Sequence, residues 1–422
     1  MIRQVTPTAN RQALEAPSAA AAGRTNAVPH RDYAFYREVI RNHALPLAYL
    51  DLDLLDANIA AFHRRADGKN IRIASKSLRA KAVLRYLLES RRTIQGIMCF
   101  SGREALYLAD QGFDDLLIAY PLVNADLIRA LAEQVKQGTT LYLMVDSAAH
   151  IDVIDHALQG IEARLPLCLD LDMSTPLPGL HFGVLRSPLQ QIDQALALHN
   201  RIQRSDKTVL AGVMGYEAQI AGVQDQIPGR FMQNQVVRLL KKWAAPKVAA
   251  RREAVVRALK DAGAQLRFVN GGGTGSVEQT IREAWVSEVT VGSGFYGSHL
   301  FDYYHHFDLL PAAGFALEVV RIPKAGIVTC AGGGYIASGG PGQEKLPLPY
   351  LPAGARLTPL EAAGEVQTPI QGAGDLKLGD PIFFRHSKAG ELCERFTHLH
   401  WIREGRITEK VTTYRGDQQC YF

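Results

Sequence analysis

Short apolar runs alternate along this chain with longer segments in which apolar residues recur at helical spacing. Nine of these runs have the length and composition of buried strands, and they cover residues 47–53, 71–75, 96–100, 115–120, 140–146, 165–173, 209–216, 266–270 and 288–292. Buried strands separated by amphipathic helices predict βα units and a parallel sheet covered on both faces. A closed (β/α)8 barrel uses eight strands, so we expect the first run, which follows directly on the N-terminal segment, to lie outside it.

The pattern changes after Phe307. Glycine and proline become frequent, the apolar runs are short and helical periodicity almost disappears, which predicts a mainly β domain over 311–422. The segment 1–32 is rich in Ala, Arg, Thr and Pro and has little hydrophobic pattern, so it is predicted to be a flexible N-terminal arm. The expected fold is therefore α/β: a TIM-like (β/α)8 barrel over 33–310 followed by a C-terminal, mainly β domain.

Composition supports two domains and excludes several classes of partner. The chain has 422 residues, of which 47% are hydrophobic, and this length exceeds the roughly 250 residues at which one core stops growing. The 47 Lys and Arg residues are spread along the chain with 42 Asp and Glu, so we expect neither nucleic acid nor a membrane surface as partner. The five cysteines include no CxxC pair, which favours reduced thiols in a cytoplasmic protein.

Lys76 stands at the end of the run 71–75, where a strand should give way to a helix. If that run is the first barrel strand, Lys76 lies at the C-terminal rim of the barrel, where such enzymes carry their catalytic groups. Because a lysine is costly to bury, this position suggests a chemical role. The alternative is a solvated rim residue whose stem packs while its amine stays in water.

Two glycine-rich turns follow the last two predicted strands, where barrels commonly bind phosphate. The backbone of such turns can close around an anion, although a glycine run by itself is usually only a turn. Together with Lys76 they point to pyridoxal 5'-phosphate, whose aldehyde forms a Schiff base with a lysine. The residues predicted to hold its phosphate are Gly271, Gly272, Gly273, Thr274, Gly275, Ser276, Gly292 and Ser293.

Several stretches resemble, in order and spacing, the alanine-racemase-type (fold-type III) pyridoxal phosphate enzymes. They are "LAYLDLDLLDANIAAF", "IRIASKSLRA", "GGGTGS", "EVTVGS" and "GIVTCAGGGYIASGG". The likeness is to the D-threonine aldolase and D-serine dehydratase branch, including proteins described as amino acid deaminase/aldolase, and covers nearly the whole chain after residue 40. It implies that Lys76 is the catalytic lysine. Enzymes of this family share their active sites between two subunits, so the resemblance also leads us to expect a homodimer.

The resemblance also places individual residues at the barrel mouth. Tyr216 matches a strand-end tyrosine that contacts the cofactor, with simple packing as the alternative; Glu217 then departs from the Gly-His of the aldolase branch. Asp172 shares a strand face with Asp170 and lies nearer the rim, which makes it a candidate for lining the site. His181 and Arg186 fall where related enzymes position substrate or cofactor oxygens, with a loop or packing role as the alternative for each.

Aldolases and dehydratases of this branch hold a divalent metal in a His-x-Cys or His-x-Asp pair, and that metal grips the substrate's β-hydroxyl. Aligning the tail with this region puts Cys393 on the cysteine and Glu391 on the histidine, with His386 five residues upstream. Cysteine favours zinc, whereas carboxylate with imidazole also admits manganese. The alternative is a buried structural cysteine, an ion-paired glutamate and no metal.

The resemblance implies a lyase that acts on a D-β-hydroxy amino acid by retro-aldol cleavage or by dehydration. Both reactions pass through a carbanion at the substrate's α carbon, so the residues indicate the cofactor better than the bond that breaks. A racemase of the same fold would need a second base, such as Tyr335 or Tyr350 from a partner subunit. A non-catalytic pyridoxal phosphate-binding protein would lack the extra β domain.

Overall fold

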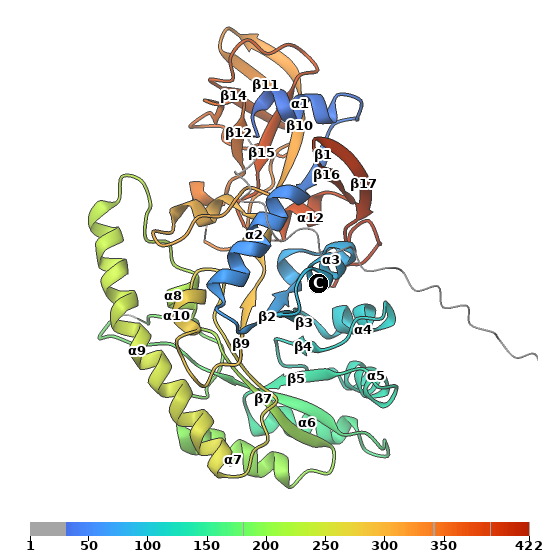
Figure 1. Ribbon diagram of the computed structural model, residues 1–422, viewed down its shortest axis with the longest axis vertical. Helices are drawn as coiled ribbons and strands as arrows, with labels where there is room; N and C mark the ends of the chain where they lie inside the picture. The colour runs from blue at the N-terminus through green and yellow to red at the C-terminus, as the bar shows by residue number, and fades with distance from the viewer. Residues whose placement is uncertain (1–30, 180, 341, 389, 422) are drawn as a thin grey trace, which may run out of the picture. The chain divides into compact units, whose positions relative to one another are not determined.

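The computed structural model describes residues 31–179, 181–340, 342–388 and 390–421. Eight parallel strands, β2 to β9, close into a barrel in chain order (Figure 1). They are β2 (Asn70–Ala74), β3 (Ile94–Cys99), β4 (Leu116–Ile118), β5 (Leu141–Val145), β6 (Leu165–Leu171), β7 (Thr208–Gly215), β8 (Phe268–Gly271) and β9 (Glu288–Val291). The predicted barrel is confirmed, and so is the exclusion of the first strand, β1 (Leu47–Asp51), from it.

The longer helices that precede or connect these strands lie on the outside of the barrel (Figure 1). They are α2 (Leu52–Arg65), α3 (Lys81–Ser90), α4 (Gly102–Asp110), α5 (Ala125–Lys136), α6 (Ala148–Ala157), α7 (Ile192–Gln203) and α9 (Phe231–Asp261). Short helices α8 (Ala218–Ala221), α10 (Val277–Thr280) and α11 (Ser293–Tyr296) and the 3-10 turn η1 (Ser75–Ser77) follow strand ends, and the 3-10 turn η2 (His299–Tyr303) follows α11. Ser101, Asn124 and Ser147 cap α4, α5 and α6 through their side-chain oxygens, each cap contributing about 1 kcal/mol.

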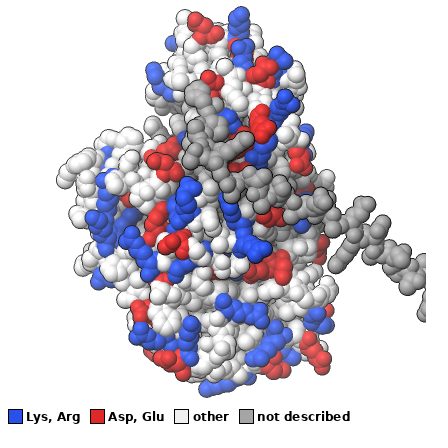
Figure 2. Space-filling view, in the orientation of Figure 1, with Lys and Arg blue, Asp and Glu red and all other residues white. Residues whose placement is uncertain are grey.

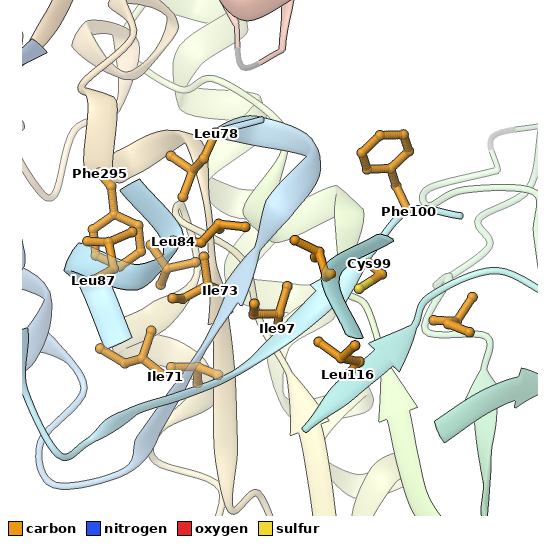
Figure 3. Packing of buried hydrophobic residues seen from close by; sticks show 14 of the residues in the cluster. Ile71, Ile73, Leu78, Leu84, Leu87, Ile97, Cys99, Phe100, Leu116 and Phe295 are labelled. Carbon is orange, nitrogen blue, oxygen red and sulfur yellow. The ribbon is translucent and has the colours of Figure 1, made fainter. Parts of the chain in front are cut away.

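Apolar packing anchors the strand that leads to Lys76. Ile71 and Ile73 of β2 point outward from the barrel and pack with Leu84 and Leu87 of α3, and all four are fully buried (Figure 3). Burying each such side chain contributes about 1.5–3 kcal/mol. Residues between them face the opposite way, because side chains alternate along a strand, so Arg72 enters the barrel interior.

The barrel interior holds a paired charge cluster. Arg72 is 2% exposed, and its Nε lies 2.7 Å from Glu288 Oε1 on β9 while its Nη1 lies 2.9 Å from Asp115 Oδ1. Asn270 of β8 donates to the same Glu288 oxygen at 2.8 Å. These partners satisfy charges that would be costly if they were buried alone.

The C-terminal residues form a second, mainly β domain built on one sheet, as predicted. Its strands run in the order β13-β14-β11-β10-β1-β16-β17, and β15 pairs with β10 and β12. The bounds are β10 (Ala313–Lys324), β11 (Ile327–Ala331), η3 (Gln343–Lys345), β12 (Leu348–Leu351), β13 (Arg356–Leu357), β14 (Gln367–Gln371), β15 (Pro381–Arg385), α12 (Glu391–Arg395), β16 (His398–Arg403) and β17 (Arg406–Thr412).

The N-terminal elements join this second sheet rather than the barrel. Strand β1 pairs antiparallel with β10 and parallel with β16, and Tyr36 of α1 (Tyr33–Ile40) packs on Tyr49 and Phe383. The predicted barrel range 33–310 therefore includes two elements, α1 and β1, that pack with the C-terminal sheet. Local pattern identified the strand, whereas its partners lie at the other end of the chain.

The predicted arm, 1–32, ends earlier than expected. Its residues 1–30 lie outside the described part of the chain, but Arg31 Nε donates to Asp51 at 2.6 Å and its Nη2 donates to Asp53 at 2.7 Å. The Asp32 side chain caps α1 by accepting from the N–H of Phe35. Arg31 and Asp32 are thus part of the folded structure.

The surface carries both signs of charge. On the face shown in Figure 2, basic and acidic side chains are interspersed among neutral ones. Among the described residues, no helix combines the length and apolar character that crossing a membrane requires.

Substitution of Gly96 on β3 tests whether the buried charge cluster is packed as described. The φ of Gly96 is +68°, and a Cβ there would overlap Arg72 Nη1 and Asp115 Oδ2. We expect Gly96→Ala to cost about 1–2 kcal/mol for the left-handed backbone and a further 1–3 kcal/mol or so for the overlap, measured as the free energy of unfolding in denaturant. Gly112→Ala is the control, because Gly112 has φ +79° and nothing within 4 Å of its Cβ position. Equal losses in the two variants would contradict the described cluster.

Candidate active site

A cavity of about 360 Å³ opens where the barrel strands end. Its volume falls in the range of about 300–1,000 Å³ that is typical of small-molecule sites. Of the residues predicted to act here, Lys76, Arg186 and Tyr216 line the cavity, as do 272–274 and 292–293. The structure thus brings the lysine and parts of both glycine turns to one space.

Lys76 lies in η1, the single 3-10 turn that follows β2. The Nζ of Lys76 lies 3.5 Å from the Tyr120 hydroxyl, and its carbonyl accepts from Arg79 Nε at 2.9 Å. The carbonyl of Leu78, two residues after Lys76, accepts two hydrogen bonds from distant parts of the chain. The Tyr296 hydroxyl donates to it at 3.0 Å and Cys393 Sγ at 3.1 Å. Helix α12 of the C-terminal sheet therefore helps to hold the Lys76 turn.

The second glycine turn lies directly against the Lys76 turn. A Cβ on Gly292 would lie 2.7 Å from Ser77 Oγ and 2.9 Å from Ala74 Cβ, both closer than real Cβ contacts. The register of β2 with β9, in which Ile73 pairs with Val291, produces this approach. Glycine is needed at 292 because any side chain there would displace the turn that carries the lysine.

The first glycine turn rests on Glu217, whose carboxylate is buried. Glu217 accepts from Gly272 N at 3.2 Å and from Ser276 Oγ at 3.0 Å, and it also accepts from Thr280. Arg252 Nη2, in a fully buried guanidinium, donates to Glu217 at 2.7 Å. Glu217 therefore orients the turn from beneath. Gly271, Gly275 and Ser276 were predicted to hold phosphate, but they do not line the cavity.

Tyr216 faces the same cavity from the end of β7. A Cβ on Gly273 would lie 3.2 Å from the tyrosine ring, so the ring lies against the glycine turn. Burial, with the neighbouring Glu217 carboxylate, raises the pKa of Tyr216 to about 12, so its hydroxyl stays protonated at neutral pH. It is available as a hydrogen-bond donor to a ligand.

The other predicted substrate residues divide between the cavity and its surroundings. Arg186 lines the cavity, and its Nε donates to Asp170 at 2.8 Å; burial raises the pKa of Asp170 to about 6 although Arg186 opposes the shift. Neither Asp172 nor His181 lines the cavity. Asp172 accepts from Ser174 N at 2.8 Å, and His181 is exposed. The strand ends at Leu171, which is why the alternation expected for Asp172 fails.

The predicted metal ligands do not form one centre. Cys393 donates to a backbone carbonyl, and burial raises the pKa of its thiol to about 12. Glu391 accepts from Lys388 N at 2.6 Å, and burial lowers the pKa of His386 to about 3. Across the described residues, no three or more His, Cys, Asp or Glu side chains are arranged to hold a metal ion. This donor set does not fit the metal that the resemblance implies.

Sequence reasoning missed two groups of cavity residues. Tyr120 lies two residues beyond β4, and the Arg186 guanidinium lies 5.5 Å from the centre of its ring. Asn270 and Thr290 line the cavity floor and are hydrogen-bonded at 2.8 Å. The available signal was a polar or aromatic residue at the end of a barrel strand, the position that already identified Lys76.

Comparison with known proteins gives a family match and a curated relative. The model of the family described as alanine racemase, N-terminal domain, matches residues 50–299. A D-threonine aldolase from an Arthrobacter species is 22% identical over 262 residues, which are 61% of this chain and 63% of that protein. This match spans less than two thirds of the aldolase's own length.

Two solved structures share the fold. A D-threonine aldolase from Filomicrobium marinum superposes with a TM-score of 0.75 at 18% identity, covering 88% of this chain and 95% of that one. A D-threo-3-hydroxyaspartate dehydratase from a Delftia species superposes with a TM-score of 0.69 at 18% identity, covering 91% and 99%. The likeness extends over both the barrel and the second sheet, which confirms the predicted fold.

The Glu217–Arg252 pair gives a stability prediction for the site. We expect Glu217→Ala to lower the free energy of unfolding by about 3 kcal/mol, because it leaves a buried guanidinium short of one partner. The control is Glu253→Ala, which removes the exposed partner of Arg257 on the same helix and should cost about 0.5 kcal/mol or less. Denaturant titration measures both, and a loss no larger than the control's would show that the turn does not depend on Glu217.

Proposed function

Because this chain belongs to the alanine racemase N-terminal domain family, we propose that it is a pyridoxal phosphate-dependent lyase acting on a D-β-hydroxy amino acid. The reaction is retro-aldol cleavage or dehydration with deamination. One observation carries the proposal: Lys76 and both glycine turns line a single cavity at the rim where barrels of this kind do chemistry. The names of the relatives, an aldolase and a dehydratase of D-hydroxy amino acids, support the class of substrate.

The cavity residues fit this cofactor. Lys76 supplies an amine for the cofactor's aldehyde, and 272–274 with 292–293 supply backbone that a phosphate can approach closely, because glycine has no Cβ. Tyr216 supplies a hydroxyl that stays protonated, since burial raises its pKa to about 12. When bound, the cofactor's ring withdraws electrons from the bonds at the substrate's α carbon.

The chain's own groups then orient the substrate and move its protons. Arg186, held by Asp170 at the cavity wall, is placed to bind an anionic group such as the substrate's carboxylate. In a dehydration the Lys76 amine accepts the proton of the α carbon. In a retro-aldol cleavage a base accepts the proton of the β-hydroxyl instead. Both routes leave an electron pair at the same carbon, so the products distinguish them.

The lysine assignment predicts a spectroscopic change. We expect Lys76→Ala to abolish both turnover and the visible absorbance of the bound cofactor, at about 420 nm, because among the described residues no other lysine lines the cavity. Lys136→Ala, which changes an exposed lysine on α5, is the control and should keep both. A Lys76→Ala protein that still attaches the cofactor covalently after borohydride reduction would refute the assignment.

A product screen identifies the reaction. D- and L-β-hydroxy amino acids are supplied to the cofactor-loaded protein, and the products are separated and identified. We expect glycine with an aldehyde, or a keto acid with ammonia, from D substrates only. Formation of the enantiomer alone would make the chain a racemase. A normal cofactor band with no product would make it a pyridoxal phosphate-binding protein without lyase activity.

A further inference from the structure

Tyr120 is a cavity-lining residue whose hydroxyl lies close to the Lys76 amine. Its hydroxyl lies 3.5 Å from Lys76 Nζ, and both residues line the same space. Tyr120 is 42% exposed and lines the cavity, so a substrate that enters the cavity can contact it. A tyrosine hydroxyl is both a donor and an acceptor, and it can therefore pass a proton in either direction.

The ring of Tyr120 is held in place by a charged group. The guanidinium of Arg186 lies over it at 5.5 Å, and that arginine is fixed by hydrogen bonds to Asp170 at 2.8 Å and to the Ala119 carbonyl at 3.3 Å. Cation–π contact and the adjoining backbone bond thus orient the phenol toward Lys76. A group that transfers a proton needs this kind of fixed geometry.

Dehydration needs two groups that act on neighbouring atoms of the substrate. The α proton and the β oxygen sit on adjacent carbons, so the base for one and the proton donor for the other must lie close together. A hydroxide is a poor leaving group, and a metal or a proton donor must assist its departure. His386, Glu391 and Cys393 do not form a metal centre, whereas Tyr120 stands within reach of the lysine that takes the α proton.

We propose that Tyr120 is a catalytic residue that protonates the departing β-hydroxyl, so that this chain dehydrates its substrate through a Lys76–Tyr120 pair and not through a bound metal. This inference rests on the proposed function. It assigns to that site one of the two reactions and a residue that the sequence analysis did not identify.

The proposed step balances without any co-reactant. The C–H bond at the α carbon breaks and its proton passes to Lys76 Nζ, while the electron pair forms the double bond to the β carbon. The C–O bond breaks with its pair on oxygen, and the Tyr120 proton converts that oxygen to water. The proton on Lys76 then passes to the phenolate oxygen across the 3.5 Å contact, which restores both groups. The Lys76 amine would then retake the cofactor's aldehyde carbon and release the enamine, which tautomerises to an imine that water hydrolyses to a keto acid and ammonia.

The test compares wild type with Tyr120→Phe, both loaded with cofactor and assayed in chelator. We expect Tyr120→Phe to lower the rate of dehydration of a D-β-hydroxy amino acid by about 100- to 10,000-fold, the usual contribution of a general acid. Exchange of the α proton with deuterated solvent, read by mass spectrometry of recovered substrate, should continue, because Lys76 is intact. The melting temperature and the binding of D-alanine, read as a shift of the visible band, should not change.

A substrate with a better leaving group separates this role from simple positioning. Chloride leaves without a proton, so Tyr120→Phe should eliminate it from β-chloro-D-alanine at close to the wild-type rate. Equal losses for the hydroxy and chloro substrates would overturn the proposal, as would wild-type dehydration that stops in chelator and returns with a divalent ion. A wild type that makes glycine and an aldehyde would also overturn it while leaving the lyase function standing. A wild type with no lyase product and no chloride release would overturn the proposed function itself.

Discussion

The pairing of β2 with β9 is the contact on which the rest of the molecule depends. It closes the barrel, and its register sets the Lys76 turn beside Gly292. The Arg72–Glu288 ion pair crosses the same seam inside the barrel. A slip of one residue would turn Arg72 toward the apolar outer layer, so the buried charges specify the register. Because a buried ion pair is weak evidence for net stability, we infer that its contribution is this specificity.

The C-terminal sheet is part of the same constraint. This sheet includes β1, which comes from the N-terminal part of the chain. After β1 the chain continues through α2 into the barrel, and its C-terminal strands β10 and β16 then pair on either side of β1. From this sheet, α12 reaches the Lys76 turn through Cys393, and Tyr414 N donates to the carbonyl of Arg79 at 2.7 Å. The turn that carries the lysine is therefore held by elements that lie far from it in the sequence. A barrel without the second domain would lack the contacts from Cys393 and Tyr414.

The sequence predicted what depends on local pattern. Strand length, burial and order identified the barrel, and a lysine and glycines at strand ends identified the cavity. What it missed depends on partners distant in the chain or on where a strand stops. Arg31 donates a hydrogen bond to Asp51, and the hydrophobic periodicity of the sequence does not predict this contact. Asp172 lies one residue past the end of β6, so it bonds within its own loop. Cys393 was assigned as a metal ligand from its aligned position in the sequence alone. In the structure its thiol donates to a carbonyl of the Lys76 turn.

Glu217 shows how a departure from the family pattern is accommodated. A carboxylate beneath a phosphate-binding turn would repel the phosphate, but this one is paired with Arg252 and accepts the donors that shape the turn. The same guanidinium also donates to a second carboxylate, that of Glu283, whose pKa is raised by burial. The Glu217 carboxylate is thus paired within the protein, and the departure leaves the proposed cofactor site usable. We expect any difference in reaction between this chain and its relatives to depend on the part of the cavity wall where Arg186 and Tyr120 lie.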